Sequence, residues 1–295
     1  VLEGVKPGDE VVSSCVFIGM TSVTTPSILL GMRVASHFVQ ALSLRGRVLG
    51  PPSASLDEWV EAMPAADRAT VRVLVTMGTV VASDTTMAAL PTLGLISCLG
   101  SGYEGVDVAA ARARGIVVTH SPAANASAVA DLAVGLMIAS IRRMFDANAF
   151  LRSGQWSGNA ARRTKPVRGL TGRRVGIYGL GAIGERVARR VEAFEMEVAY
   201  HNRRPRSDVR YPYHGSLLEL ARWADVLVVS VRADNTNRHS VDAEVLAALG
   251  PSGHVVNIAR GGVVDDAALV SALRSGHLAA AGLDVFENEP ALNRG

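Results

Sequence analysis

The sequence of 295 residues is poor in cysteine, in aromatic residues and in long apolar or basic runs. Its two cysteines, Cys15 and Cys98, lie far apart in apolar surroundings, which favours reduced, buried thiols over a disulfide or a metal site. No apolar run reaches the ~20 residues that a membrane span needs. The formal charge of +3 is modest, and no dense basic run interleaved with aromatics indicates nucleic-acid binding. We therefore expect a cytoplasmic protein with no metal, no membrane and no nucleic-acid partner.

Residues 1–26 are expected to form an extension with no assignable role. Their first ten residues include acidic side chains and no basic segment before an apolar stretch, so they do not predict a signal peptide.

From residue 27 onward, short apolar runs alternate with amphipathic segments, which is typical of a parallel sheet covered by helices on both faces. The predicted strands of a first domain, residues 27–121, are 27–30, 48–49, 71–75 and 95–99, and its predicted helices are 34–44, 56–63 and 85–89. A long helical stretch that connects the two domains is predicted over 127–153.

A second domain of the same doubly wound kind is predicted over residues 122–290, since the chain is long enough for two cores. Its predicted strands are 174–178, 198–200, 211–214 (weak), 226–230, 254–258 and 280–285, and its predicted helices are 216–223, 242–249 and 266–274.

The strongest motif is a glycine-rich turn between a predicted strand and a predicted helix of this second domain. It consists of Gly179, Leu180, Gly181, Ala182, Ile183 and Gly184. In a β-α-β unit this G-x-G-x-x-G pattern permits a tight turn, lets a pyrophosphate approach the backbone and lets the helix pack on the strand. We therefore expect a dinucleotide whose phosphates meet the start of a helix, with all but Leu180 of this turn as contacts.

The end of the next strand indicates which dinucleotide is bound. An acidic residue there would accept hydrogen bonds from the ribose of NAD, but this chain has Asn202 followed by Arg203 and Arg204. The two guanidinium groups predict a clamp for the 2′-phosphate of NADP, so NADP(H) is preferred and NAD(H) remains possible. The alternative is a solvated basic loop, because Arg206 and Arg210 are close by.

Four motifs together resemble those of the D-2-hydroxyacid dehydrogenase family. They are GSGYEGVD at 100–107, GLGAIG at 179–184, NIARGGVVD at 257–265 and GLDVFENEP at 282–290. The HNRR sequence at 201–204 is most similar to that of the NADPH-preferring hydroxypyruvate and glyoxylate reductases of the family. The resemblance implies a flavodoxin-like substrate domain, a Rossmann coenzyme domain and a homodimer formed through the 127–153 helix.

The resemblance also implies a set of site residues. Arg260 corresponds to the arginine that holds a keto-acid substrate, since one guanidinium can bind both the carboxylate and the ketone oxygen. The backbone N–H groups of Ser101 and Gly102 are expected to bind the same carboxylate. Glu289 corresponds to the carboxylate that supports a general-acid histidine, with Glu287 as a rival on spacing alone. The remaining expected coenzyme contacts are Ser230, Val231, Ile258 and Asp284.

The general-acid histidine itself is missing, because the family's Pro-His motif follows the Glu289 position at some distance and residues 1–295 contain none. None of the seven histidines has that context. Two explanations stay open: the chain is truncated, with 291–295 starting a return segment, or it is a degenerate member that binds NADPH without turnover.

The resemblance predicts NADPH-dependent reduction of glyoxylate and hydroxypyruvate to 2-hydroxy acids. The alternatives are a regulatory NADPH-binding protein and an NAD-linked dehydrogenase of another D-2-hydroxy acid.

Overall fold

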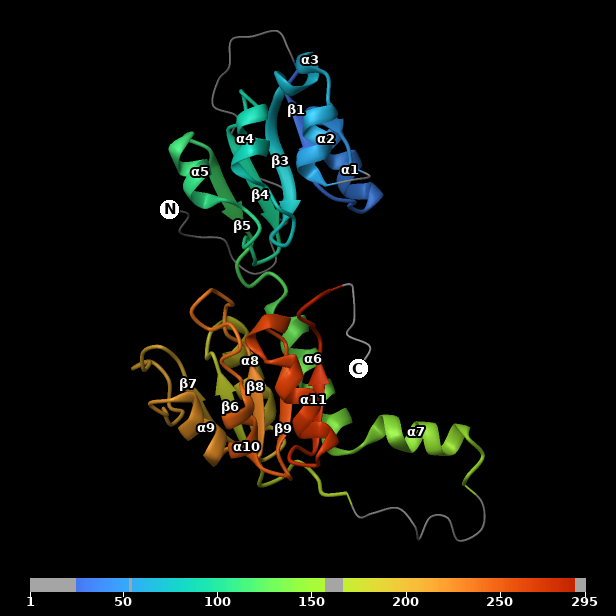
Figure 1. Ribbon diagram of the computed structural model, residues 1–295, viewed down its shortest axis with the longest axis vertical. Coiled ribbons are helices and arrows are strands. Elements are labelled where there is room, and N and C mark those ends of the chain that lie inside the picture. The colour runs from blue at the N-terminus through green and yellow to red at the C-terminus, as the bar shows by residue number, and fades with distance from the viewer. Residues whose placement is uncertain (1–24, 53–54, 157–166, 290–295) are drawn as a thin grey trace. The chain divides into compact units, whose positions relative to one another are not determined.

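The computed structural model describes residues 25–52, 55–156 and 167–289, which fall into two compact units divided between His120 and Ser121 (Figure 1). The predicted extension, apart from residues 25 and 26, and the predicted return segment at 291–295 lie outside the described residues.

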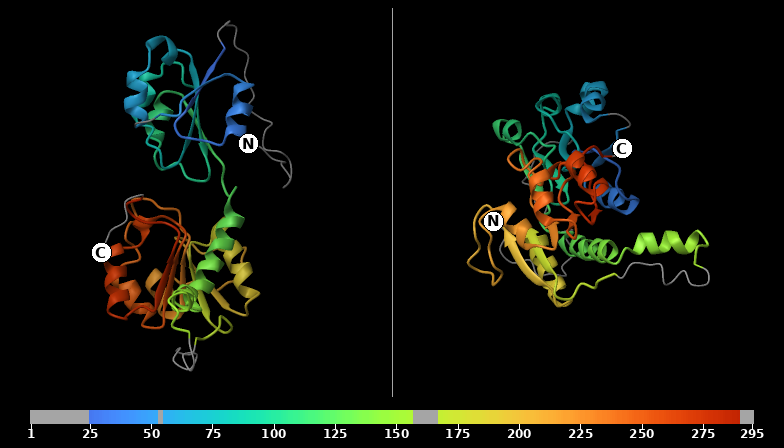
Figure 2. Two further views of the ribbon diagram at one scale, coloured as in Figure 1. Left: turned by 90° about the vertical axis from the view of Figure 1, so that its right-hand side faces the viewer. Right: turned by 60° about the horizontal axis from the view of Figure 1, so that its bottom comes forward.

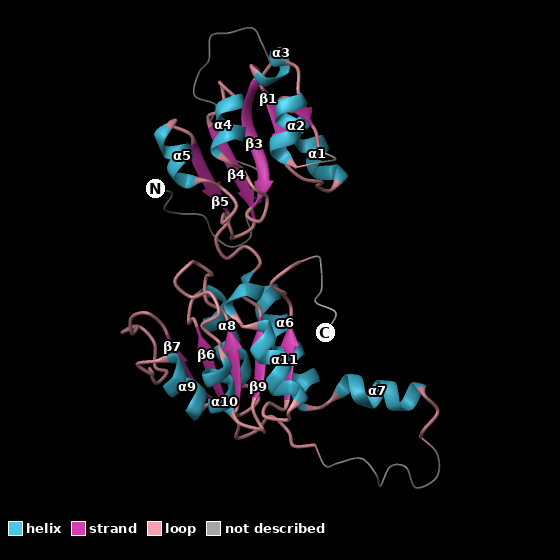
Figure 3. Cartoon of the chain, viewed as in Figure 1, coloured by secondary structure: helices cyan, strands magenta, loops and turns pink. Residues whose placement is uncertain are grey.

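The first unit contains one parallel sheet of five strands in the order β2-β1-β3-β4-β5 (Figure 3). Its elements are β1 (Ser27–Leu30), α1 (Ser36–Ser43), β2 (Arg47–Leu49), α2 (Leu56–Ala62), α3 (Ala65–Arg68), β3 (Val71–Met77), α4 (Asp84–Ala89), β4 (Leu95–Leu99), α5 (Val108–Ala113) and β5 (Val117–His120). This strand order is that of flavodoxin-like folds.

Apolar side chains on both faces of this sheet make two cores. Ile28, Leu30 and Val75 pack against α1, whereas Leu29 and Leu74 belong to the larger core with α2, α4 and α5. Elements α5 and β5 were absent from the sequence prediction. The strand β5 lies at the edge of the sheet and is largely exposed, so it lacks the continuous apolar run that marks the inner strands.

The second unit also contains a parallel sheet of five strands, in the order β10-β9-β8-β6-β7. Its elements are α6 (Ala126–Ile141), α7 (Met144–Arg152), β6 (Arg174–Tyr178), α8 (Ala182–Glu192), β7 (Glu197–His201), α9 (Leu217–Trp223), β8 (Val226–Val229), α10 (Ala243–Leu249), β9 (His254–Asn257), the 3₁₀ helix η2 (Gly261–Val263), α11 (Asp266–Arg274) and β10 (Ala280–Leu283).

The weak strand predicted at 211–214 is reduced to one bridge, in which Tyr213 pairs with Tyr200 of β7. This bridge extends the sheet at the β7 edge, where the third strand of the Rossmann order 3-2-1-4-5-6 would lie. The fold prediction of two doubly wound parallel-sheet domains is therefore confirmed, with the third strand of the second domain almost absent.

Helices cover both faces of the second sheet (Figure 2). Buried side chains of α6 and α8 pack on one face, and those of α9, α10 and α11 pack on the other. Because β6, β7 and β8 are parallel, their carboxyl ends share one edge of the sheet, and the loops that follow them lie together.

The helical stretch predicted over 127–153 consists of two helices, α6 and α7. Arg143, the N-cap residue of α7, adopts a left-handed conformation with φ of 51°. Helix α6 buries an apolar stripe against the sheet, but α7 buries no residue and projects from the rest of the second unit (Figure 1). Beyond Ile141 there is no sheet to cover, so packing no longer holds the chain in one straight helix. Among the described helices, none has the length and apolar character that crossing a membrane requires.

Candidate functional site

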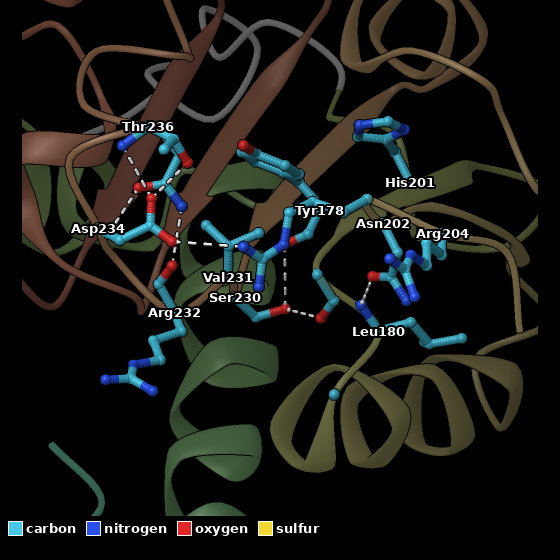
Figure 4. Close-up of a pocket in the computed structure, with 14 residues that line it drawn as sticks. Tyr178, Leu180, His201, Asn202, Arg204, Ser230, Val231, Arg232, Asp234 and Thr236 are labelled. Atoms are coloured by element: carbon cyan, nitrogen blue, oxygen red, sulfur yellow. Dashed lines mark hydrogen bonds and ion pairs between the residues drawn. The ribbon is translucent and has the colours of Figure 1, made fainter.

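A cavity of about 700 Å3 opens at the carboxyl ends of β6, β7 and β8 (Figure 4). The strand order reverses between β6 and β8, and ligands of doubly wound sheets bind at such a switch point. The cavity is lined by Tyr178, Gly179, Leu180, Gly181, His201, Asn202, Arg203, Arg204, Ser230, Val231, Arg232, Asp234, Thr236 and Asn237.

Each of the three glycines of the turn is favoured at its position for a different physical reason. Gly179 has φ of 99°, and a Cβ there would lie 2.6 Å from the backbone N of Val231. A Cβ on Gly184 would lie 2.3 Å from the carbonyl oxygen of Gly179, so a larger residue would push α8 off the turn. Around Gly181 no atom lies within 4 Å of such a Cβ. The bare backbone of Gly181 therefore faces open space in the cavity, where a ligand can approach.

The turn leads directly into α8, which begins at Ala182 and runs to Glu192. The first N–H groups of a helix have no intrahelical partner and carry the positive end of its dipole. Ala182 and Ile183 supply such groups, so this edge of the cavity is suited to an anionic group.

The loop after β7 supplies positive charge. Arg203 is 88% exposed, and its Nη1 lies 3.7 Å from a carboxylate oxygen of Asp234 across the cavity. Arg204 is exposed, and in the described part of the chain no acidic side chain pairs with it. The neighbouring arginines differ, since Arg206 binds Glu185 at 3.1 Å and Arg210 binds Glu192 at 2.5 Å. The loop is thus not uniformly solvated, and Arg203 and Arg204 are the pair that faces the cavity.

Asn202 has a partner that the sequence did not indicate. The backbone N–H of Leu180 donates to its side-chain oxygen over 2.7 Å, which ties the β7 loop to the glycine turn (Figure 4).

The opposite wall follows β8. Ser230 donates from its hydroxyl to the carbonyl of Gly179 over 2.8 Å, closing the wall against the turn. Asp234 accepts hydrogen bonds from the backbone and side chain of Thr236, which lower the pKa of its carboxyl, with a further contribution from Arg203. The cavity therefore contains one ionised carboxylate beside the guanidinium groups of Arg203, Arg204 and Arg232.

Sequence reasoning missed several residues of this cavity, namely Tyr178, His201, Asp234, Thr236 and Asn237. Their common signal is that they end or follow the parallel strands β6, β7 and β8. His201 donates from Nδ1 to the carbonyl of His214 over 2.9 Å, and its ring stacks on Tyr178 with centroids 5.8 Å apart. These contacts make a rigid aromatic side to the cavity.

Arg260 lies in the turn after β9 and does not line this cavity. Asn257, 1% exposed, shapes the turn by donating to the carbonyl of Arg260 and accepting from the N–H of Ala259, both over 3.1 Å. The half-buried Arg260 donates to the carbonyl of Ala259 over 2.8 Å. A Cβ on Gly261 would lie 2.0 Å from the carbonyl carbon of Phe286, so the turn is pressed against the segment that carries the predicted carboxylates.

The two rival carboxylates have different partners. Glu289 is exposed and accepts the backbone N–H of Phe286 over 2.6 Å. Glu287 accepts from Arg238 over 2.7 Å and is hydrogen bonded to Nε2 of His239 over 2.8 Å. Within the described residues, Glu287 is therefore committed to an internal cluster. The role predicted for Glu289 stays a prediction.

Ser101 and Gly102 lie in the first unit, on the loop after β4. Within the described residues, neither backbone N–H donates a hydrogen bond, which leaves both available to a carboxylate. The loop is held from two sides: His120 donates from Nδ1 to the carbonyl of Ser101 over 3.0 Å, and a Cβ on Gly78 would lie 2.2 Å from Gly102.

The structure thus brings together Gly179, Gly181, Asn202, Arg203, Arg204, Ser230 and Val231 around one cavity. Ala182, Ile183 and Gly184 follow in the first turn of α8. Ile258 is buried, and Asp284 is exposed at the end of β10; neither lines the cavity, and their contacts stay predictions.

Two models of one protein family match the chain. The D-isomer specific 2-hydroxyacid dehydrogenase NAD binding domain matches residues 134–294, and the catalytic domain of the same family matches residues 53–209. Among characterised proteins, the chain is 43% identical over 203 residues to a hydroxyphenylpyruvate reductase of Plectranthus scutellarioides, covering 68% of this chain and 64% of the relative. It is 44% identical over 208 residues to a 2-ketogluconate reductase of Gluconobacter oxydans, covering 70% of this chain and 66% of the relative. The matches thus span slightly less than two thirds of the length of these two relatives.

Solved structures show the same likeness. The chain matches an NADPH-dependent glyoxylate/hydroxypyruvate reductase from Sinorhizobium meliloti, solved in complex with NADP and malonate, with a TM-score of 0.82 and 38% identity. The match covers 92% of this chain and 82% of that one.

Proposed function

Because this chain belongs to the D-isomer specific 2-hydroxyacid dehydrogenase family, we propose that it reduces small 2-keto acids, glyoxylate and hydroxypyruvate first, with NADPH. The observation that carries the coenzyme choice is the cavity wall formed by Arg203 and Arg204, with an amide rather than a carboxylate at Asn202. A carboxylate at that position would repel the 2′-phosphate of NADP, whereas two guanidinium groups match its oxygens.

The residues of the cavity fit a dinucleotide. Its volume of about 700 Å3 lies within the range of ligand pockets, and the open space at Gly181 leaves room for a pyrophosphate at the start of α8. When bound, the nicotinamide supplies the hydride that reduces the ketone carbon. Arg203 and Asp234 are both exposed and lie 3.7 Å apart, so a phosphate could take the place of this carboxylate as the partner of Arg203.

On the substrate side, the proposal assigns the carboxylate to Arg260 and to the N–H groups of Ser101 and Gly102. Arg260 would also hold the ketone oxygen and stabilise the negative charge that develops there. Glu289 would support the protonated form of a general-acid histidine. These roles rest on the family motifs and on the available donors described above.

The test is to measure NADPH oxidation by the full-length protein with glyoxylate and with hydroxypyruvate, alongside NADPH binding. Turnover with either acid is expected. Binding of NADPH without turnover of these or other 2-keto acids, 2-ketogluconate and hydroxyphenylpyruvate included, would replace the enzyme by a coenzyme-binding protein. Faster turnover with NADH than with NADPH would overturn the coenzyme choice.

A cytoplasmic homodimer is part of the same proposal. The free, buried thiol of Cys98 supports a reducing compartment. On α7, Met144, Phe145 and Leu151 are 53%, 74% and 56% exposed, an apolar surface that a second copy would cover. Sedimentation velocity of the Phe145→Glu, Leu151→Glu variant should show monomers where the unaltered protein shows dimers.

A further inference from the structure

Both backbone polar groups of Leu180, the N–H and the carbonyl, are hydrogen bonded to side chains of one loop. The N–H of Leu180 donates to the side-chain oxygen of Asn202 over 2.7 Å, and Nη1 of Arg206 donates to the carbonyl of Leu180 over 3.0 Å. Leu180 is 1% exposed and lies between the first two glycines of the turn. The first and last residues of the loop 202–206 are therefore both hydrogen bonded to the turn. Arg203 and Arg204 lie between these two anchoring residues.

Arg206 is itself fixed by several partners. Its guanidinium also binds Glu185 in the first turn of α8 over 3.1 Å and pairs with Asp208. Its backbone N–H donates over 2.7 Å to the hydroxyl of Tyr200, which is 1% exposed and cannot move without disturbing the core. The side chain is 26% exposed, against 88% for Arg203. Arg206 thus joins four parts of the second unit: the turn, the start of α8, β7 and its own loop.

These partners distinguish the role of Arg206 from that of the arginines that line the cavity. Two carboxylates already neutralise it, and the hydrogen bond from Arg206 is the largest cause of the lowered pKa of both Glu185 and Asp208. Binding a phosphate would require Arg206 to give up at least one of these contacts. A direct ligand role is therefore disfavoured, and a structural link to the turn is favoured.

We propose that Arg206 is a positioning residue for the coenzyme, which acts through the carbonyl of Leu180 to hold the pyrophosphate turn in place. This inference rests on the proposed dinucleotide site. Arg206 acts on the part of the site that binds the pyrophosphate, which NADPH and NADH share. Its loss therefore weakens the binding of both coenzymes by the same factor. Arg204 differs, because a 2′-phosphate contact concerns NADPH alone.

The experiment is a fluorescence titration of the purified chain with NADPH and, separately, with NADH. For Arg206→Ala we expect both dissociation constants to rise by a similar factor, roughly tenfold, as is typical for loss of a charge-assisted contact. The matched control is Arg210→Ala. Arg210 belongs to the same connection between β7 and α9 and also pairs with a glutamate of α8, Glu192, yet it has no bond to the turn. Both dissociation constants of this control should stay as in the unaltered chain.

Two further variants keep the test decisive if Arg206→Ala folds poorly. Tyr200→Phe removes the hydroxyl that holds the backbone of Arg206 and keeps the ring, and Arg206→Lys keeps the charge but cannot reach all of its acceptors. A similar loss of affinity for NADPH and for NADH supports the proposal. A loss confined to NADPH would make Arg206 a phosphate ligand, and no loss in any of the three variants would remove its role. If the unaltered chain binds neither coenzyme, the dinucleotide site fails and the role of Arg206 fails with it.

Discussion

The buried imidazole of His254 makes the second unit acid-sensitive. His254 starts β9, is 6% exposed and has its Nδ1 hydrogen bonded to the hydroxyl of Ser140 on α6 over 2.7 Å. Burial lowers its pKa from 6.5 to about 4, helped by the nearby charge of Arg173 and opposed by Asp225. Between these two pH values the unfolded chain binds a proton that the folded chain does not, so stability falls as the pH falls.

The size of the effect follows from the two pKa values. One pKa unit corresponds to about 1.4 kcal/mol, so the free energy of unfolding should drop by up to about 3 kcal/mol as the pH falls from above 6.5 to below 4. Between pH 7.5 and pH 5.5 the His254 share is about 1.4 kcal/mol. This share is present in full above the unfolded-state pKa and is lost toward the folded-state pKa.

Urea denaturation at pH 7.5 and pH 5.5 measures this share. Trp223 reports on the second unit when Trp59 and Trp156 are replaced by Phe. The free energy of unfolding falls between pH 7.5 and pH 5.5, and this fall should be about 1.4 kcal/mol smaller in His254→Asn than in the parent. The control, His277→Asn, removes an exposed imidazole that is also hydrogen bonded to a serine hydroxyl, that of Ser275, and so separates burial from the serine contact. An equal pH dependence in His254→Asn and the parent would refute the reasoning.

Three further predictions concern the coenzyme and substrate sites. Replacing Arg203 and Arg204 together by Ala should raise the dissociation constant of NADPH by about tenfold or more and that of NADH by less than about twofold; equal losses would remove the phosphate clamp. Gly184→Ala should lower the melting temperature, because its Cβ would lie 2.3 Å from a carbonyl oxygen. Gly181→Ala should leave the melting temperature unchanged and weaken the binding of both coenzymes. A thermal scan in which Gly181→Ala is the less stable of the two variants would contradict the turn geometry. In the full-length protein, Arg260→Lys should lower kcat/KM for glyoxylate by about 10²-fold with NADPH affinity unchanged, since an ammonium cannot bind two oxygens side by side; an unchanged kcat/KM would take Arg260 out of the substrate site.

The inner strands were predictable because they are buried on both faces and form uninterrupted apolar runs. Val226–Val229 is such a run, and it appears as β8 with every residue buried. The edge strand β5 was not predictable in this way, since only one of its four residues is even partly buried. The break at Arg143 escaped notice because both sides of it are made of good helix formers, and it depends on where the sheet beneath α6 ends.

The glycine turn and the Asn202 to Arg204 sequence were readable because the motif and its position within a β-α-β unit are local. Asp234 was not, because its place opposite Arg203 depends on β8 lying beside β6, which sequence distance does not reveal. The distinction between Arg204 and Arg206 was also hidden. Both are arginines in one short loop, and only their partners in the folded chain differ.

The two hydrogen bonds to the backbone of Leu180 bear on how coenzyme preference can be engineered. Residues 202 and 206 anchor the loop, and residues 203 and 204 between them are exposed. On the proposed coenzyme site, substitutions at 203 and 204 should alter selectivity between NADPH and NADH while the anchored glycine turn stays intact. A graft of the whole loop from another protein, by contrast, must bring both anchors with it.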